Sequence, residues 1–251
     1  PSMESDLSGK STLDSRVNGA VNFYLKYANT PADYSGTVSR LFLGVQIQCA
    51  QCHDHKTEAW KQADFRRFTA CFMQAKVQPV NRTLDKKRTM QVELTDNAQP
   101  FKVPARLAGK VKDNGRTEYA MAEPAALDGT SFATEGNRRQ AIAKWITAPQ
   151  NPWFAAAIVN RMWAHFLGRG FVNPIDDFRD SNPPVMPELL RKLAEDFVAH
   201  GYDLKYLIKL ICSTQVYQLS SLPAKHLDEG NTYWARYRLK PLKPEVLMDM
   251  L

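Results

Sequence analysis

The chain has 251 residues, of which 44% are hydrophobic and 24% are charged, as in a soluble globular protein with one large domain or two small ones. No run approaches the ~20 apolar residues that a membrane helix needs, so a transmembrane segment is excluded for this stretch. The formal net charge of +7 suits the docking of an acidic partner, but no compact basic cluster interleaved with aromatic residues indicates nucleic-acid binding. Because the chain does not start with Met and stops at Leu251 inside a helical pattern, we expect a processed or partial chain.

The first part of the chain is predicted to be helical. Residues 14–28 form a candidate helix, followed by a loop. An amphipathic helix is then expected from Thr37, with apolar residues at three- and four-residue steps that put Cys49 and Cys52 on its buried stripe. A further helix is expected over 62–76. Its apolar face consists of Phe65, Phe68, Phe72 and Met73.

The character of the sequence changes over residues 77–134. Pro, Gly and Asn residues break the helical period there, and short alternating runs such as 90–94 predict strands. The run 113–115 is a turn signal. This stretch is therefore expected to be a small strand-and-loop insertion.

The helical period returns from Asn137. Helices are expected over 138–147, after the cap and proline at Asn151-Pro152, from Pro187, over 203–213 and from Pro244. The predicted fold class is mainly α. Its parts are a helical segment over 1–76, the strand-and-loop insertion over 77–134 and a helical C-terminal domain over 135–251.

The run Cys49-Ala50-Gln51-Cys52-His53 is the attachment pattern of a c-type haem. Each thiol adds across one vinyl group of the porphyrin, and one helical turn separates the two sulfurs by about the distance that the vinyls need. His53 would then supply the proximal imidazole ligand of the iron. The pattern is short, so two other interpretations stay open. One is a zinc site with Cys49, Cys52, Cys71 and either His53 or His55 as ligands, and the other is an incidental pair of cysteines.

The motif also bears on the compartment and on the other cysteines. Because haem c is attached outside the cytoplasm, we expect a periplasmic or cell-surface protein. Cys71 and Cys212 could form a disulfide or stay as buried thiols. The aromatic face of the helix over 62–76 could pack on a porphyrin or belong to an ordinary core.

A distal iron ligand has three candidates, His165, Met186 and Met73, and an open or water-bound site is the fourth possibility. His165 lies on a predicted apolar helix face, where a hydrogen-bonded core histidine is the alternative. His55 follows His53 too closely to reach the opposite face of the same iron. It could bond a propionate, orient its loop or bind a second metal with Asp54.

The remaining histidines and a group of acidic residues have simpler interpretations. His200 is expected at a helix C-terminus, where it interacts with the helix dipole, and His226 in a loop without a specific role. Four carboxylates bracket a proline-rich turn and are expected to pair with arginines rather than to bind calcium or to do acid–base chemistry. They are Asp176, Asp177, Asp180 and Glu188.

Two parts of the chain carry long motifs. The first is Phe42-Leu43-Gly44-Val45-Gln46-Ile47-Gln48-Cys49-Ala50-Gln51-Cys52-His53-Asp54-His55. The second part includes Asn151-Pro152-Trp153-Phe154-Ala155, Val159-Asn160-Arg161-Met162-Trp163-Ala164-His165-Phe166-Leu167-Gly168-Arg169-Gly170 and Gly201-Tyr202-Asp203-Leu204-Lys205. Together they resemble the planctomycete-type cytochrome c surface proteins. The resemblance covers roughly 37–76 and 125–251 and implies export, a c-type haem and further domains, but no reaction.

The chain departs from the pattern of that family at two positions. Lys56 stands where the family usually has Pro, and Met186 stands where it usually has His before the Pro-Glu-Leu-Leu run. His and Met are the two common distal ligands of haem c. Met186 therefore either retains a candidate iron ligand or replaces a structural histidine with an apolar residue.

These observations lead to one expected function and two alternatives. We expect an exported c-type cytochrome with one covalently attached haem c, which transfers single electrons to an unidentified redox partner protein. The first alternative is a haem enzyme domain with an open distal site and peroxidase-like or substrate-oxidising chemistry. The second is a structural or surface-binding module in which haem or zinc is only a staple.

Overall fold

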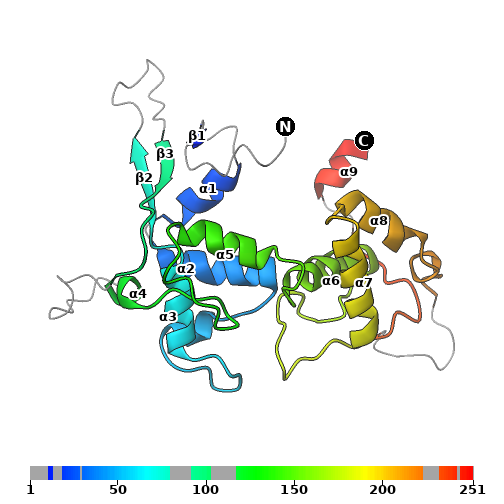
Figure 1. The fold of residues 1–251 in the computed structure, drawn as a ribbon. Helices are drawn as coiled ribbons and strands as arrows, with labels where there is room; N and C mark the ends of the chain where they lie inside the picture. The colour runs from blue at the N-terminus through cyan, green and yellow to red at the C-terminus, as the bar shows by residue number, and fades with distance from the viewer. Residues whose placement is uncertain are drawn as a thin grey trace, which may run out of the picture. The chain divides into compact units, whose positions relative to one another are not determined.

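The computed structural model describes residues 11–13, 19–28, 30–79, 92–102, 117–222, 232–241 and 244–250. The chain divides into two compact units. Unit 1 comprises Pro1–Arg40 and Gln46–Ala148, and unit 2 comprises Leu41–Val45 and Pro149–Leu251. The fold is mainly α with a small β-sheet, which confirms the predicted fold class (Figure 1). Among the described helices, none is both long enough and apolar enough to cross a membrane.

Unit 1 combines short helices with a three-stranded antiparallel sheet of order β1-β3-β2. Val77 of β2 lies opposite Leu94 of β3, and Leu13 of β1 lies opposite Val92. The predicted strand over 90–94 is therefore present as β3, which covers Val92–Asp96, while residues 90 and 91 lie outside the described residues. The elements are β1 (Ser11–Leu13), α1 (Gly19–Lys26), α2 (Pro31–Val38), η3 (Gln48–Gln51), α3 (Gln62–Ala70), β2 (Ala75–Pro79), β3 (Val92–Asp96), α4 (Thr117–Met121) and α5 (Arg138–Ile146).

The long amphipathic helix predicted from Thr37 does not form. The α-helix α2 ends at Val38, a π-helical turn η2 covers Ser39–Leu43, and Gly44 takes a left-handed conformation with φ 69°. After Gly44 the chain reverses, so that the side chain of Gln48 lies where a Cβ atom of Gly36 would be. Side-chain period alone could not show this reversal, and the buried positions expected for Cys49 and Cys52 were wrong.

The core of unit 1 is built around α3. Phe65 and Phe68 are almost fully buried, Phe72 is buried, and Phe68 and Phe72 meet edge to face with ring centroids 5.5 Å apart. The hydroxyls of Ser35 on α2 and Thr69 on α3 share a buried hydrogen bond of 2.7 Å. The predicted aromatic face thus belongs to the protein core.

Helix α5 packs with unit 1. The guanidinium of Arg139 forms an ion pair of 2.7 Å with Asp96 at the end of β3, and the backbone N–H of Arg138 donates to Gln74. Asn137 caps the helix by accepting a hydrogen bond from the N–H of Gln140. The boundary between the two compact units falls after Ala148.

Unit 2 is a helical unit whose elements begin where the local signals predict. Asp203 caps α8 by accepting hydrogen bonds from two backbone amides, and Pro187 is the first residue of α7. The main core cluster contains Trp163, Phe171 and Trp234, whose rings are in mutual contact. The elements are α6 (Phe154–Leu167), α7 (Pro187–Ala199), α8 (Leu204–Ser213), η4 (Val216–Gln218) and α9 (Pro244–Met250).

A loop returns from the end of α6 along the same helix and is fixed by one buried side chain. Asn160 is fully buried and hydrogen-bonds both the N–H and the C=O of Val172 as well as the C=O of Ile175. Gly170 leaves room for this amide, because a Cβ there would lie 2.5 Å from Asn160 Oδ1. These contacts set the start of the 172–187 loop.

Candidate functional site

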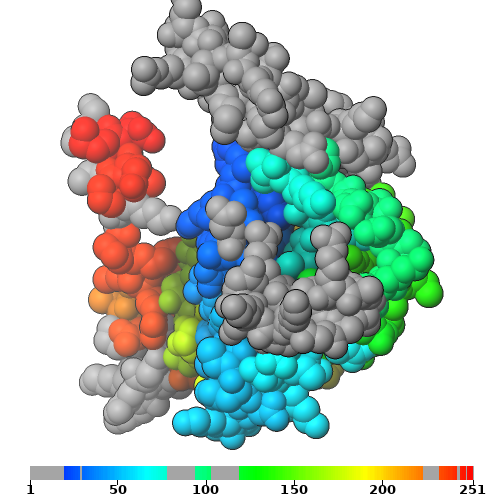
Figure 2. All heavy atoms as spheres, turned by 90° about the vertical axis from the view of Figure 1, so that its left-hand side faces the viewer, coloured from blue at the N-terminus to red at the C-terminus, as the bar shows by residue number. Residues whose placement is uncertain are grey.

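The Cys-x-x-Cys-His motif of unit 1 begins on the 3-10 turn η3 (Gln48–Gln51), whose C-cap is Cys52, and His53 follows directly. Ile47 and Ala50 point into the core, and the N–H of Ala50 donates to the C=O of Ile47 at 3.0 Å. The thiols of Cys49 and Cys52 are both exposed and are not joined to each other. The stretch that follows the turn shows at the surface of unit 1 in light blue to cyan (Figure 2). The turn therefore presents both sulfurs outward from a buried anchor.

The turn is braced by the start of α3. The N–H of Gln62 donates to the Asp54 carboxylate at 2.9 Å, and the side-chain amide of Gln62 donates to the C=O of Gln51 at 3.1 Å. Between them, the N–H of His55 donates to the C=O of Trp60 at 2.8 Å. Residues 51–62 thus form a closed, hydrogen-bonded loop, and the position of the motif does not depend on the buried helix stripe that the sequence predicted.

His53 is exposed, and one of its ring nitrogens already has a hydrogen-bond partner. Its Nδ1 lies 2.7 Å from the backbone C=O of Asp54. A carbonyl oxygen can only accept, so Nδ1 carries the proton and donates it, which leaves the lone pair on Nε2. This tautomer and this kind of partner are those of a histidine oriented to bind a metal through Nε2.

His55 is half-buried and its Nδ1 has the opposite role. It accepts hydrogen bonds from the backbone N–H groups of Thr57 at 3.3 Å and Glu58 at 3.1 Å. The ring therefore holds the 55–58 turn together, in line with the loop-orienting role among its predicted alternatives. The contacts of His55 do not test whether it would bond a haem propionate.

Cys71 is separated in character from the cysteines of the motif. It is fully buried, and its Sγ donates to the C=O groups of Arg67 and Ala125 at 3.6 Å each. Burial raises the pKa of the Cys71 thiol to about 12. In the described part of the chain, no three His, Cys, Asp or Glu side chains come together to hold a metal. The zinc ligand set predicted with Cys71 is therefore not assembled.

Of the two alternatives left open for Cys71 and Cys212, the disulfide is not formed. Both thiols are free, and Cys212 is half-buried on α8 of unit 2. The buried-thiol alternative describes Cys71.

The two main candidates for a distal ligand lie in unit 2. His165 is exposed near the end of α6 rather than on the apolar face expected for it, and Met186 is 40% exposed as the N-cap of α7. His53 belongs to unit 1, as does the half-buried Met73. A role of any of these residues as distal ligand stays a prediction.

His200, Asp177 and Glu188 make contacts that fit the structural roles expected for them. His200 follows the last residue of α7, and its Nδ1 lies 2.8 Å from the C=O of Asp196. Asp177 pairs with Arg179 at 3.1 Å, and Glu188 pairs with Arg191 at 2.8 Å. His226 lies outside the described residues.

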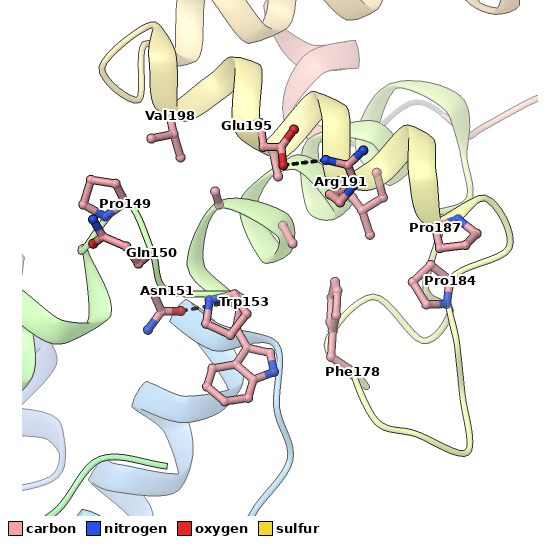
Figure 3. Close-up of a pocket in the computed structure, with 15 residues that line it drawn as sticks. Pro149, Gln150, Asn151, Trp153, Phe178, Pro184, Pro187, Arg191, Glu195 and Val198 are labelled. Atoms are coloured by element: carbon pink, nitrogen blue, oxygen red, sulfur yellow. Dashed lines mark hydrogen bonds and ion pairs between the residues drawn. The ribbon is translucent and has the colours of Figure 1, made fainter. Parts of the chain in front are cut away.

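Unit 2 contains a pocket of about 520 Å³ that was not predicted from the sequence (Figure 3). Its walls come from the start of α6, the exposed face of α7 and the loop between them. Its aromatic side chains, Trp153 and Phe178, are separated by 25 positions in sequence. The sequence offered one indication of this pocket, the prolines at 149, 152, 184 and 187. Prolines mark the ends of helices but do not by themselves indicate a binding site.

The fold and the turn together define a mainly α-helical protein with a surface-exposed Cys-x-x-Cys-His motif. Residues 12–77 match the family model PSCyt2, described as a protein of unknown function (DUF1549). Residues 138–251 match PSD1, also described as a protein of unknown function (DUF1553). Both families are typical of planctomycete cytochrome-c-like surface proteins. No curated protein and no solved structure matches the chain.

Proposed function

We propose that the η3 turn attaches one c-type haem and that the protein transfers single electrons through it. The supporting observation is the combination of two outward thiols, Cys49 and Cys52, with a His53 ring whose Nδ1 is held by the Asp54 carbonyl. A covalent haem needs two accessible sulfurs one turn apart and an imidazole with a free Nε2 lone pair. The name of the PSCyt2 family, which covers this segment, points in the same direction.

The residues would act in the following way. Cys49 and Cys52 would each add an S–H bond across one vinyl group, which forms a thioether without a leaving group. His53 would bind the iron through Nε2, while its Nδ1–H stays bonded to the chain and keeps the imidazole electron-rich. A bound haem c would supply the one-electron Fe(III)/Fe(II) couple. The Asp54 and Gln62 contacts would keep the proximal side rigid.

The surface position of the turn suits outer-sphere transfer to another protein. Because Cys49 and Cys52 are exposed, a haem attached to them would be accessible to a redox partner. The formal net charge of +7 favours an acidic partner and an association rate that falls as salt is raised. Since the attachment of haem c takes place outside the cytoplasm, the proposal places the protein in the periplasm or at the cell surface.

The absorption spectrum of the chain, produced in the periplasm of a host with haem c maturation enzymes, tests the proposal. We expect sharp α and Soret bands after reduction, and colour that stays with the protein through denaturation and acid–acetone extraction. Cys49→Ala/Cys52→Ala should abolish this colour. Cys212→Ala, which removes a thiol from unit 2, is the matched control and should retain it.

Two results would contradict the attachment: a colourless protein, or haem that is extracted by acid and acetone. The function has a separate readout in carbon monoxide binding to the reduced protein. A low-spin iron that does not react supports electron transfer with two protein ligands. Fast binding supports the open-site haem enzyme instead. His165→Ala and Met186→Ala, measured one at a time, would show which residue is the sixth ligand.

A further inference from the structure

The pocket of unit 2 has two chemically different walls. Its volume of about 520 Å³ lies within the usual range of small-molecule sites, about 300–1,000 Å³. Trp153 and Phe178 lie on one side of it, and Arg191 and Glu195 of α7 lie on the other (Figure 3). Most of the remaining lining is proline, alanine and aliphatic side chain.

Contacts with Gly44 hold Phe178 in position. The N–H of Phe178 donates to the C=O of Gly44 at 2.9 Å, and a Cβ on Gly44 would lie only 2.7 Å from the Phe178 ring. Trp153 immediately precedes the first residue of α6 and is half-buried. Phe178 is consequently held in place before any ligand enters, which lowers the entropy cost of binding.

The polar wall offers donors and acceptors side by side. Arg191 is bonded to Glu195 at 2.6 Å and to Glu188 at 2.8 Å, so its guanidinium is held between two carboxylates. The guanidinium is a donor only and the carboxylates are acceptors only. A ligand group that both donates and accepts, such as a hydroxyl, can bond to both members of this pair.

Two features disfavour an anionic ligand. The positive charge of Arg191 is outweighed locally by Glu188 and Glu195. The backbone N–H groups of Trp153 and Phe154 at the start of α6, where an anion could bind, both donate to Asn151 Oδ1 at 3.0 Å. The site lacks the unpaired positive charge that phosphate or carboxylate recognition requires.

We propose that this pocket binds a neutral pyranose unit of a glycan. A pyranose has an apolar face of C–H groups that stacks on aromatic rings such as Trp153 and Phe178. It also carries hydroxyls on its edge that meet the Arg191 and Glu195 pair. A purely apolar ligand would make no hydrogen bond to that pair, and an anion would meet two carboxylates. The glycan site is independent of the haem turn and goes beyond electron transfer.

Saturation-transfer difference NMR and calorimetry on the full chain test this proposal with cellobiose, lactose and chitobiose as probes. We expect at least one of these neutral disaccharides to bind, and glucuronic acid and inorganic phosphate not to bind. Trp153→Ala should weaken the binding at least 10-fold. Glu195→Gln changes an exposed side chain, so the fold is retained, and it should weaken the binding several-fold. Lys192→Gln lies on the same helix but outside the pocket, and it should leave the affinity unchanged.

Several outcomes would overturn the proposal. One is no binding of any of the three disaccharides by protein with a native circular dichroism spectrum. Another is binding that survives both Trp153→Ala and Glu195→Gln unchanged, which would place the sugar elsewhere. Binding of a polyproline peptide in the pocket without any sugar binding would replace the glycan by a protein partner.

Discussion

Replacing Asn160 with alanine is expected to destabilise unit 2 strongly. The Asn160 side chain is fully buried and makes three hydrogen bonds. Its Nδ2 donates to the C=O of Val172 and to the C=O of Ile175, both at 3.1 Å, and its Oδ1 accepts from the N–H of Val172 at 3.0 Å. These bonds tie the middle of α6 to the loop that leads to Phe178.

The size of the effect follows from what the substitution leaves behind. Val172 is 1% exposed, so water cannot replace the partners that its N–H and C=O lose. Each buried group without a partner costs about 1–3 kcal/mol, and we expect the free energy of unfolding to fall by about 3–4 kcal/mol in total. A domain of this kind has only about 5–15 kcal/mol to lose.

Hydrogen exchange read by mass spectrometry localises this effect better than a global unfolding curve. Peptides covering 168–178 should lose protection in Asn160→Ala, while peptides of α3 in unit 1 should not. Asn182→Ala is the matched control, because Asn182 donates to the C=O of Asp177 at 3.0 Å from a half-buried position that water can reach. It should cost about 1 kcal/mol or less.

A double-mutant cycle with Gly170 sharpens the test. A Cβ on Gly170 would lie 2.5 Å from Asn160 Oδ1, so Gly170→Ala should cost less when residue 160 is already alanine. The reasoning is refuted if Asn160→Ala and Asn182→Ala lower the unfolding free energy equally, or if the two substitutions at 160 and 170 are additive.

Two other substitutions have expected effects of known sign. Gly44→Ala should destabilise unit 2 by about 2–3 kcal/mol in urea denaturation, because φ is 69° and the new Cβ would meet the Phe178 ring. Gly201→Ala is the control, since φ is 63° but the space around the new Cβ is open, and it should cost only about 1 kcal/mol. Equal costs of the two substitutions would rule out the clash with Phe178. The pKa of the Cys71 thiol is raised to about 12 in the folded protein, against 9.0 for an ordinary cysteine. As pH rises, the thiol of the unfolded chain therefore loses its proton first. The contribution of Cys71 to the free energy of unfolding is constant below pH 9 and falls between pH 9 and 12. Cys71→Ala should remove the contribution of Cys71 to this slope, about 1.4 kcal/mol per pH unit, and identical pH profiles of the two proteins would contradict the burial argument.

Signals that act within a few residues predicted the fold well. The predicted helix starts at Arg138, at Pro187 and after Asp203 are placed correctly, because the contacts that start a helix involve the next two or three residues only. The Cys-x-x-Cys-His motif is equally local, and its three residues are together on one turn. The mainly α class follows from such signals summed along the chain.

Contacts between distant residues decided the rest. The chain reverses after Gly44, which brings Gln48 against Gly36, and Cys49 and Cys52 are exposed rather than on a buried helix face. The pocket of unit 2 brings Trp153 together with Phe178 and Arg191, which are far apart in the sequence. Side-chain period reports which residues are apolar, but only tertiary packing determines which apolar residues find a partner and which polar groups face a cavity.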